Sequence, residues 1–327
     1  MIENRSIIEN NKLSLKENPD DVLKVKNITK VYNKKDQKYK ALDDVSFEVK
    51  RGEIFGIVGE SGSGKSTLAR QITRLENPTE GQIILNGKEI TNLKGRELRN
   101  IYKDIQMIFQ DPLGSFDPRL KIGKSIDELL KNKKIPPEIR KQKIVELLNL
   151  VGLDEQYIDK YPKELSGGQC QRAAIAKALS TEPSILICDE VTSALDVSIQ
   201  GQVLSLLKEL REKKQMTYLF ICHDLALVEL LCDRVIVLNK GSVVESGVAK
   251  EVINNPKHPY TKLLLSSIFP IGDNKWVIPD IVIDEGDAIY SSCKFYNRCK
   301  FKNQNCTNSK LELKKVGENH FVRCCNV

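Results

Sequence analysis

Eight consecutive residues have the types and the spacing of a phosphate-binding loop. The run Gly59-Glu60-Ser61-Gly62-Ser63-Gly64-Lys65-Ser66 fits the pattern G-x-x-x-x-G-K-[ST]. An apolar stretch at 54–58 precedes it and a helical pattern at 67–72 follows it, so a strand, a glycine-rich turn and a helix succeed one another as this motif requires. A turn of the same composition that binds nothing is the alternative, and the agreement of motif and context argues against it.

The residue types in this run indicate how a nucleotide would be held. Gly62 and Gly64 let the backbone curl so that successive N–H groups point inward, and the following helix adds the positive end of its dipole. Lys65 is expected to reach the β- and γ-phosphates, while Ser66 offers its hydroxyl to Mg²⁺. The residues predicted to contact ATP here are Gly59, Ser61, Gly62, Gly64, Lys65, Ser66 and Thr67.

Two carboxylates end a second apolar run. Residues 185–188 are apolar and Asp189 and Glu190 follow them, a pattern typical of a buried parallel strand that delivers acids to the carboxyl edge of a sheet. Asp189 is expected to hold Mg²⁺ through water, and Glu190 to polarise the attacking water as a general base. A surface acidic pair at a strand end is the alternative, and this segment alone does not decide between them.

A second glycine-rich turn, Leu165-Ser166-Gly167-Gly168-Gln169, precedes a helical stretch at 171–179. Such a helix N-terminus suits an anion as well, yet two anion cradles are excessive for one nucleotide. The difficulty disappears if the second cradle serves the nucleotide of a partner subunit. With these residues the chain resembles the ATPase subunit of an ABC transporter, whose signature motif is Leu-Ser-Gly-Gly-Gln and whose two subunits sandwich two ATP molecules head to tail. The resemblance predicts that Ser166, Gly167, Gly168 and Gln169 contact ATP.

The elements that must position these motifs follow from the sequence pattern. Strands are predicted at 22–28, 41–49, 54–58 and 82–85, with a tight turn at Asn86-Gly87 and a last hairpin from 233 to 245. Between residues 95 and 162 the pattern becomes helical, at 126–130 and 139–151. The resemblance, which covers about 21–270, implies an α/β P-loop NTPase with a RecA-like core, an antiparallel β subdomain and a helical subdomain.

Three domain-level segments are expected. Residues 1–20 are polar and predicted to be a disordered arm. Residues 21–254 are predicted to form the ABC ATPase domain, with the helical subdomain at about 96–164. Residues 255–327 are predicted to form an extension of the oligopeptide-transporter type that carries a cysteine cluster.

The resemblance assigns roles to four more residues. Tyr32 matches the aromatic residue that stacks on adenine, although a packed strand-end tyrosine is the alternative. Gln110 matches the glutamine that ligates Mg²⁺ and links the site to the membrane subunits. Asp196 matches the end of the loop, Ser193-Ala194-Leu195-Asp196, that crosses the dimer interface. His223 matches the switch histidine at the γ-phosphate, so that Glu190, His223 and Gln110 form the predicted catalytic group.

Composition indicates a soluble globular chain of 327 residues, with 40% hydrophobic and 29% charged residues. No apolar stretch reaches the roughly 18 residues that a membrane span needs. The N-terminus lacks the basic and apolar regions of a signal peptide, so we expect a cytoplasmic protein. Together with the resemblance, this places the chain at the cytoplasmic face of the cell membrane.

Three features resemble the importers of oligopeptides, dipeptides and nickel. They are the run from Gln110 to Arg119, the segment His258-Pro259-Tyr260-Thr261, and a cysteine-bearing C-terminal extension. Pro118-Arg119 resembles the second ATPase of a pair, although Phe116-Asp117 replaces the more usual Leu-Asn. The implied partners are another ABC ATPase in a heterodimer, two membrane permeases and an extracytoplasmic substrate-binding protein, and the choice between peptide and nickel stays open.

The C-terminal cysteines have the spacing Cys293-x5-Cys299-x6-Cys306-x17-Cys324. Four thiolates could hold zinc or an iron–sulfur cluster, and the cysteines could also be unligated. The resemblance favours a [4Fe-4S] cluster, with Cys325 as a competitor for the fourth position. We expect this segment to need its metal to fold, because it has few large apolar residues, and we expect ATP binding to survive its loss.

The charge of the chain leaves a second function class open. The net charge is +7, and residues 293–327 hold eight Lys or Arg residues against Glu312 and Glu318. A basic tail can contact nucleic acid or an anionic membrane, or be a solvated face. The alternative function is therefore a soluble ABC ATPase that acts on nucleic acid or ribosomes. Such proteins usually carry two cassettes or a long coiled-coil insertion, and this chain has neither, so no nucleic-acid partner is expected.

Overall fold

The computed structural model describes residues 20–34, 37–193, 195–266, 293–308 and 311–327. Residues 1–19 of the predicted arm and residues 267–292 of the predicted extension lie outside this part. The strands are β1 Asp21–Lys34, β2 Gln37–Lys50, β3 Ile54–Val58, β4 Glu80–Leu85, β5 Lys88–Glu89, β6 Ile105–Ile108, β7 Ile185–Asp189, β8 Thr217–Cys222, β9 Arg234–Asn239, β10 Ser242–Val248, β11 Lys314–Lys315 and β12 Phe321–Val322. The α-helices are α1 Lys65–Ile72, α2 Gly95–Ile101, α3 Ile122–Asn132, α4 Pro137–Leu150, α5 Gly167–Leu179, α6 Val197–Lys214, α7 Leu225–Leu231, α8 Ala249–Asn254, α9 Pro259–Ser266 and α10 Asn305–Asn308.

Among the described residues, the central sheet has eight strands in the order β11-β12-β10-β9-β3-β8-β7-β6. The strands from β9 through β6 in this order run parallel to their neighbours. Every residue of β3, β7 and β8 is buried, because apolar layers cover both faces of a parallel sheet. Since the carboxyl ends of parallel strands lie at one edge, the segments that begin at Gly59, Glu190 and His223 start beside one another.

A second, antiparallel sheet has the order β2-β1-β4-β5 and packs on the central one. Phe47 of β2 stacks on Phe55 of β3 with 5.0 Å between the ring centroids, within the apolar core that the two sheets share. The predicted Asn86-Gly87 turn is confirmed, since both residues have positive φ, 48° and 76°. Tyr32 lies within β1 rather than at its end, because β1 continues to Lys34.

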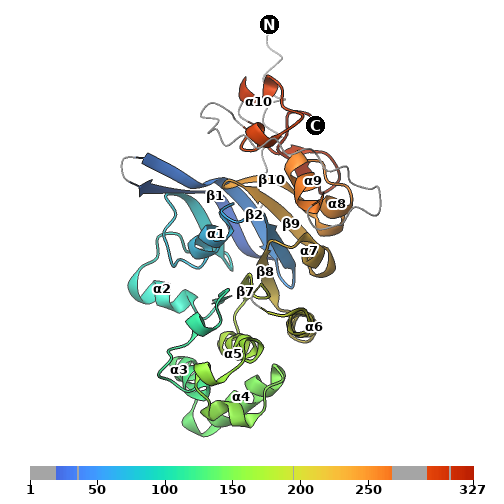
Figure 1. The fold of residues 1–327 in the computed structure, drawn as a ribbon. Helices are drawn as coiled ribbons and strands as arrows, with labels where there is room; N and C mark the ends of the chain where they lie inside the picture. Colours follow the sequence, from blue (N-terminus) through green and yellow to red (C-terminus); the bar gives the residue numbers. More distant parts are fainter. Residues whose placement is uncertain (1–19, 35–36, 194, 267–292, 309–310) are drawn as a thin grey trace.

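Helices α3, α4 and α5 form most of a helical lobe at one end of the sheets (Figure 1). Helix α4 starts with Pro137 at its first position, where proline loses no hydrogen bond, and buries Ile144 and Leu148 four residues apart. The chain turns after it at Gly152, which has a φ of 71°. The helices predicted at 126–130 and 139–151 are therefore confirmed, with α3 longer than expected.

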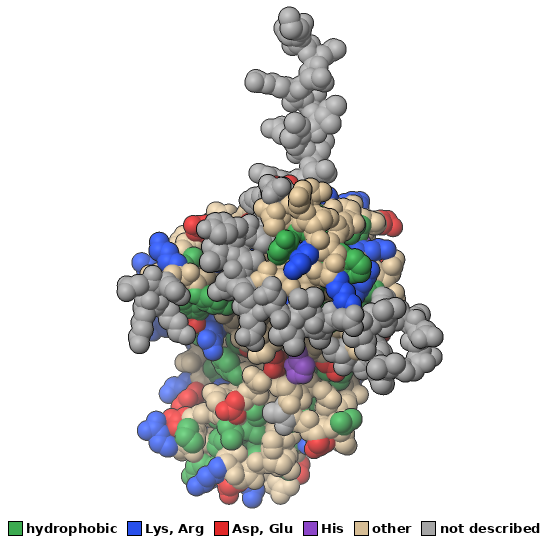
Figure 2. All heavy atoms as spheres, turned by 45° about the horizontal axis from the view of Figure 1, so that its top comes forward, with side chains coloured by type: hydrophobic (Ala, Val, Ile, Leu, Met, Phe, Trp, Pro, Cys, Tyr) green, Lys and Arg blue, Asp and Glu red, His purple; other side chains and the backbone are tan. Residues whose placement is uncertain are grey.

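The C-terminal residues join the central sheet. Strand β12 pairs antiparallel with β10, with Val322 opposite Glu245 and Phe321 opposite Ser246. In Figure 1 this segment lies beside α8 and α9, at the opposite end of the molecule from the helical lobe. None of the helices in the described ranges is long and apolar enough to cross a membrane. Figure 2 shows Lys and Arg side chains interspersed with Asp and Glu over the face it presents.

Candidate active site

The glycine-rich loop leaves β3 and enters α1 through Gly64. Gly64 is the N-terminal cap residue of α1 with a φ of 106°, and among the described residues no side chain caps this helix. A Cβ atom at Gly64 would lie 2.8 Å from the carbonyl oxygen of Ala41, so this position requires glycine. At Gly62 a Cβ atom would meet no described atom within 4 Å. Among the described residues the helix therefore begins without a side-chain cap, and the loop is open beside Gly62, as an anion site requires.

Lys65 is held inside this loop. Its Nζ donates hydrogen bonds to the carbonyl oxygens of Gly59 at 2.7 Å and Glu60 at 2.9 Å. The side chain is 4% exposed, and burial lowers the pKa of its amino group. The carboxylate of Glu190 lies 4.0 Å away and partly offsets that effect. The ion pair with Glu190 is a long one at 4.0 Å, which leaves the ammonium group able to bind an anionic ligand as well.

Ser66 and Asp189 meet at the carboxyl edge of the sheet. The Ser66 hydroxyl donates to Asp189 Oδ1 at 3.4 Å. Burial raises the pKa of Asp189, and the Ser66 hydrogen bond opposes this rise. Mg²⁺ usually takes one or two protein oxygens and completes its shell with water and phosphate, so this pair fits the cation of MgATP. Within the described ranges no group of three or more His, Cys, Asp or Glu side chains could hold a metal ion.

Glu190 lies where several predicted site residues converge. Gln110 Nε2 donates to its Oε2 at 3.0 Å, and His223 Nδ1 lies 3.9 Å from its Oε1. The backbone of Glu190 has a φ of 49°, and its N–H donates to the carbonyl of Ile221 at 2.9 Å. A non-glycine residue in this region carries strain of roughly 1–3 kcal/mol, which the neighbouring strand must maintain.

Tyr32 reaches the start of α1 from the antiparallel sheet. Its hydroxyl donates to Glu76 Oε2 at 2.5 Å, and Lys30 Nζ lies 5.1 Å from the ring centroid. The hydroxyl also interacts with the side chain of Thr67, while burial and Glu76 raise the pKa of Tyr32. Both ends of the side chain are thus fixed beside the phosphate-binding loop.

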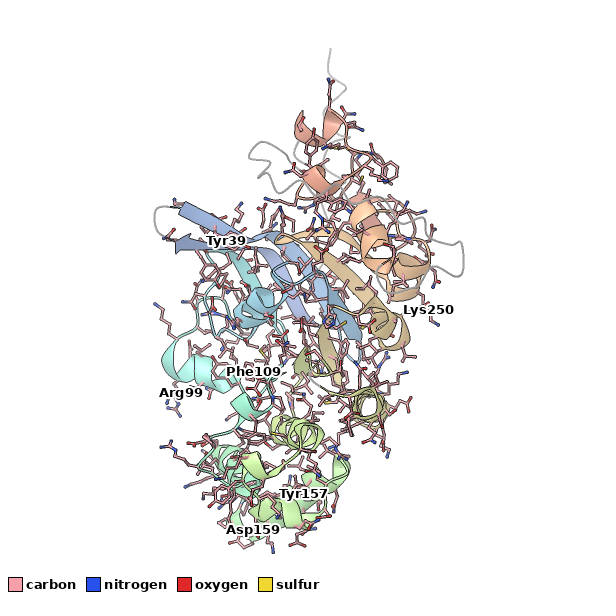
Figure 3. All side chains as sticks on the ribbon, viewed as in Figure 1. Tyr39, Arg99, Phe109, Tyr157, Asp159 and Lys250 are labelled. Carbon is pink, nitrogen blue, oxygen red and sulfur yellow. The ribbon has the colours of Figure 1, made fainter. Side chains whose placement is uncertain are left out.

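The second glycine-rich turn satisfies two of its own backbone N–H donors, those of Ser166 and Gln169. Ser166 caps α5: its hydroxyl accepts from Gln169 N–H at 3.3 Å, and its own N–H donates to Gln169 Oε1 at 3.0 Å. Gln169 Nε2 donates to the hydroxyl of Tyr157 at 2.9 Å, in the helical lobe (Figure 3). A Cβ atom at Gly168 would lie 2.5 Å from Ile199 Cγ2, whereas one at Gly167 would meet only Leu195 at 4.0 Å. Gly168 is therefore required for packing against α6, and Gly167 is not.

The structure separates the two turns within one chain. Helix α5 lies in the helical lobe, and α1 lies above it against the sheets (Figure 1). Asp196, after the second carboxylate, caps α6 by accepting from Ile199 N–H at 3.0 Å and is exposed. Ala194 of the same loop lies outside the described residues. Ser166, Gly167, Gly168, Gln169 and Asp196 thus are not gathered with the loop at Gly59–Ser66.

Known proteins match this chain in sequence over most of its length. The family model "ABC transporter" matches residues 42–193, and "Oligopeptide/dipeptide transporter, C-terminal region" matches residues 244–306. The oligopeptide transport ATP-binding protein OppF of Haemophilus influenzae is 45% identical over 312 residues, which are 93% of this chain and 94% of that protein. The oligopeptide transport ATP-binding protein AppF of Bacillus subtilis is 40% identical over 321 residues, which are 94% of this chain and 98% of that protein.

Solved structures show the same fold. The dimeric ATP-binding cassette MJ0796 bound to ADP and Pi has a TM-score of 0.64 and 33% identity, and the match covers 69% of this chain and 98% of that one. The cbiO1 protein from Clostridium perfringens has a TM-score of 0.64 and 32% identity, and the match covers 72% of this chain and 92% of that one. The chain belongs to the ATP-binding subunits of oligopeptide ABC transporters. The predicted family and the ABC ATPase fold are confirmed.

The C-terminal cysteines of this ABC transporter subunit lie near one another. Burial raises the pKa of the Cys293 thiol to about 11, and Cys306, Cys299 and Cys324 add to the rise. Cys306 Sγ lies 2.7 Å from Cys325 Sγ, and burial and this contact raise the pKa of Cys325 to about 12. The five thiols therefore lie in one region, although the described residues do not assemble three of them as metal ligands.

Two residues of this ABC subunit that contact the phosphate-binding loop were not predicted as site residues. Arg298 forms an ion pair with Glu60, and the Tyr260 hydroxyl accepts the Glu60 N–H. Both occur in segments that the sequence marked only as typical of this transporter branch, Cys293–Cys299 and His258–Thr261. No local pattern could have assigned them to the loop, because Arg298 and Glu60 are 238 residues apart in the chain.

Proposed function

We propose that this chain energises oligopeptide import by hydrolysing ATP at the edge of the central sheet. The observation that carries the proposal is the convergence of Lys65, Gln110 and His223 on the carboxylate of Glu190. This group lies next to the Ser66–Asp189 pair, which suits the magnesium ion of MgATP. As an ATP-binding subunit of the oligopeptide transporter family, the chain is an ATPase coupled to transport.

The residues divide the work by position. The uncapped N-terminus of α1 and Lys65 bind the phosphates, with Gly59, Ser61, Gly62, Gly64 and Thr67 shaping the cradle. Tyr32 stacks on the base. Glu190 takes the proton of the attacking water, Gln110 orients that carboxylate through its amide, and His223 contacts the γ-phosphate. Ser66, Asp189 and Gln110 would hold Mg²⁺, which would supply positive charge opposite the phosphates.

The second turn acts on the nucleotide of another subunit. Its separation from the phosphate loop supports a site shared between two ATPases, to which Ser166, Gly167, Gly168, Gln169 and Asp196 contribute from the opposite side. The partner is a different ABC ATPase, so the pair is a heterodimer. Two permeases and an extracytoplasmic substrate-binding protein complete the transporter, which places this chain at the cytoplasmic face of the membrane.

We propose the domain limits on the same grounds. Residues 21–254 form the ATPase domain, with the helical subdomain at about 96–164, and residues 255–327 form the extension. Support comes from α3 and α4, which lie within the helical lobe, and from the oligopeptide-type match at 244–306. Helix α5, at Gly167–Leu179, extends the lobe beyond residue 164. The alternative of a soluble ABC ATPase acting on nucleic acid or ribosomes is set aside, because oligopeptide transport proteins match over 93–94% of this chain and the oligopeptide-type family match reaches into the tail as far as residue 306.

Uptake by the reconstituted complex tests the proposed function. The complex of this chain, its partner ATPase, the permeases and the binding protein should accumulate a labelled oligopeptide in vesicles when ATP is supplied on this chain's side. The same complex with Glu190→Gln is the control and should not accumulate it. Uptake of Ni²⁺ without any peptide uptake would contradict the proposed substrate.

We also infer that Cys293, Cys299, Cys306 and Cys324 ligate a metal group, with a [4Fe-4S] cluster preferred over zinc. Support comes from the soft donor set and from the proximity of the thiols. Protein purified without oxygen should be brown and lose its colour in the four-fold Cys→Ser variant. A colourless protein with one zinc ion would overturn the cluster, and a metal-free protein would overturn both.

A further inference from the structure

Two residues from the C-terminal part of the chain bind Glu60, the second residue of the phosphate-binding loop. Arg298 donates from Nη1 to Glu60 Oε2 at 2.7 Å and from Nη2 to Oε1 at 2.9 Å, which is a two-pronged ion pair. The hydroxyl of Tyr260, in α9, accepts the backbone N–H of Glu60 at 2.8 Å. Both the side chain and the backbone of this loop residue are therefore held from outside the ATPase core.

Phe295 joins the two contacts into one unit. Its ring centroid lies 5.4 Å from that of Tyr260 and 5.5 Å from the guanidinium carbon of Arg298. Phe295 is 4% exposed and Tyr260 is fully buried, so neither can change position without disturbing the core. The backbone N–H of Tyr260 donates to His258 Nδ1 at 3.0 Å, which fixes the start of α9 as well.

Glu60 in turn holds Lys65. The carbonyl oxygen of Glu60 accepts from Lys65 Nζ at 2.9 Å, beside the similar bond from Lys65 to Gly59. The orientation of the Glu60 peptide group therefore sets one of the carbonyl oxygens that place the ammonium group. The Arg298 guanidinium also neutralises a carboxylate of the phosphate-binding loop that would otherwise repel a bound triphosphate.

We propose that Arg298 and Tyr260 are positioning residues for ATP: they hold Glu60 so that the loop presents Lys65 to the phosphates. This inference rests on the proposed function of the loop at Gly59–Ser66. It makes the C-terminal extension part of the nucleotide site rather than a separate structural appendage. ATP affinity therefore depends on the extension, contrary to the expectation that binding survives its loss.

The expected effect is moderate. The side chains of Arg298 and Glu60 are 31% and 38% exposed, and partly exposed ion pairs are weakened by water and salt. Their two-pronged geometry and the removal of a repulsive charge act in the other direction. We expect Arg298→Gln to raise the KM for ATP roughly three- to ten-fold, with less effect at high salt.

Steady-state ATPase assays on the assembled transporter test this, with full-length chain throughout. Arg298→Gln should raise KM and leave kcat within about two-fold, since the residue does not touch the reacting atoms. The matched control is Lys294→Gln, which removes another ion pair between the same segment and the ATPase core, Lys294 Nζ to Asp43 Oδ2 at 3.3 Å. Asp43 keeps its pair with Lys40, so KM should not change in this control.

A double-mutant cycle separates positioning from a general loss of structure. If Arg298 acts through Glu60, then Arg298→Gln should have little further effect on KM in a Glu60→Gln background. A purely structural defect would give the same KM change in both backgrounds. Tyr260→Phe should also raise KM, because it leaves the Glu60 N–H without its acceptor. Arg298→Lys keeps the charge without the fork and should fall between the wild type and Arg298→Gln.

Lys65→Ala distinguishes a failure of this inference from a failure of the proposed function. Unchanged ATP affinity in Lys65→Ala would refute the loop as the ATP site, and the inference with it. Lost affinity in Lys65→Ala together with wild-type KM in Arg298→Gln and Tyr260→Phe would overturn the inference alone. An equal rise of KM in Lys294→Gln and Arg298→Gln would overturn it too.

Discussion

The two glycine-rich helix N-termini of this chain are completed in opposite ways. Helix α1 begins at Gly64 with no side-chain cap among the described residues, and the space beside Gly62 is open. Helix α5 begins at Ser166, whose hydroxyl and backbone exchange hydrogen bonds with Gln169. The first turn leaves its donors for a ligand, whereas the second already uses part of its own.

The glycines of the two turns also differ, because one serves the ligand site and the other serves packing within the chain. Gly62 has a φ of 77° with open space beside it, so its residue type serves the backbone conformation and the ligand. Gly168 has ordinary backbone geometry but packs against Ile199, so its residue type serves the contact between α5 and α6. We infer that the phosphate loop binds nucleotide within one chain, while the second turn adds to a site that a partner chain has already filled.

Glu190→Gln should produce the largest effect and tests the chemistry on the side of the first turn. Loss of a general base typically lowers the rate roughly 10²- to 10⁴-fold, while the phosphate contacts stay intact. We expect ATP binding close to wild type and accumulation of a closed ATP-bound dimer. Single-turnover hydrolysis and gel filtration with ATP check this, and near wild-type turnover in the assembled complex would sink the assignment.

Lys65→Ala and Ser166→Ala should separate the two turns directly. Lys65→Ala removes the cation that faces the phosphates, and we expect the isolated subunit to lose roughly 100-fold in ATP affinity. Ser166→Ala should leave that affinity unchanged and lower only the activity of the complex, because we propose that its turn acts on another subunit's nucleotide. Titration with a fluorescent ATP analogue measures both, and weaker binding by isolated Ser166→Ala protein would break the comparison.

Gly168→Ala should destabilise the fold, and Gly167→Ala should not. The added methyl group would lie 2.5 Å from Ile199 Cγ2, and overpacking of this kind costs about 1–3 kcal/mol. At Gly167 the nearest atom is 4.0 Å away, so unfolding in urea should match the wild type. Equal unfolding midpoints for the two variants would show that the second turn does not depend on this packing.

Acid should destabilise the segment around His258 and Tyr260, which contacts the phosphate-binding loop. Burial lowers the pKa of His258 from 6.5 to about 4, against an opposing effect of Glu245. Because the unfolded chain takes up the proton first, stability falls as the pH drops from 6.5 toward 4, by about 2 kcal/mol at pH 5. His258→Gln should lose this part of the pH dependence of unfolding. An unchanged pH profile in that variant would assign the acid sensitivity to other groups.

Much of the site could be predicted because its motifs are local. The phosphate loop occupies eight consecutive residues after a buried strand, so backbone rules alone place Lys65 and Ser66 at a helix N-terminus. Asp189 and Glu190 follow a short apolar run, and parallel strands bring such ends to one edge. The roles of the individual residues and the metal at the cysteines remain predictions.

The sequence by itself determined the strands that end at the site and the helix that begins there, because hydrophobic pattern and turn residues act over a few positions. Only the tertiary structure decided which distant residues contact the phosphate-binding loop. Arg298 meets Glu60, and Val322 pairs with Glu245, through contacts between distant segments that no local pattern encodes. These contacts exist because the C-terminal segment adds a strand to the central sheet, and that pairing depends on the shape of the whole fold.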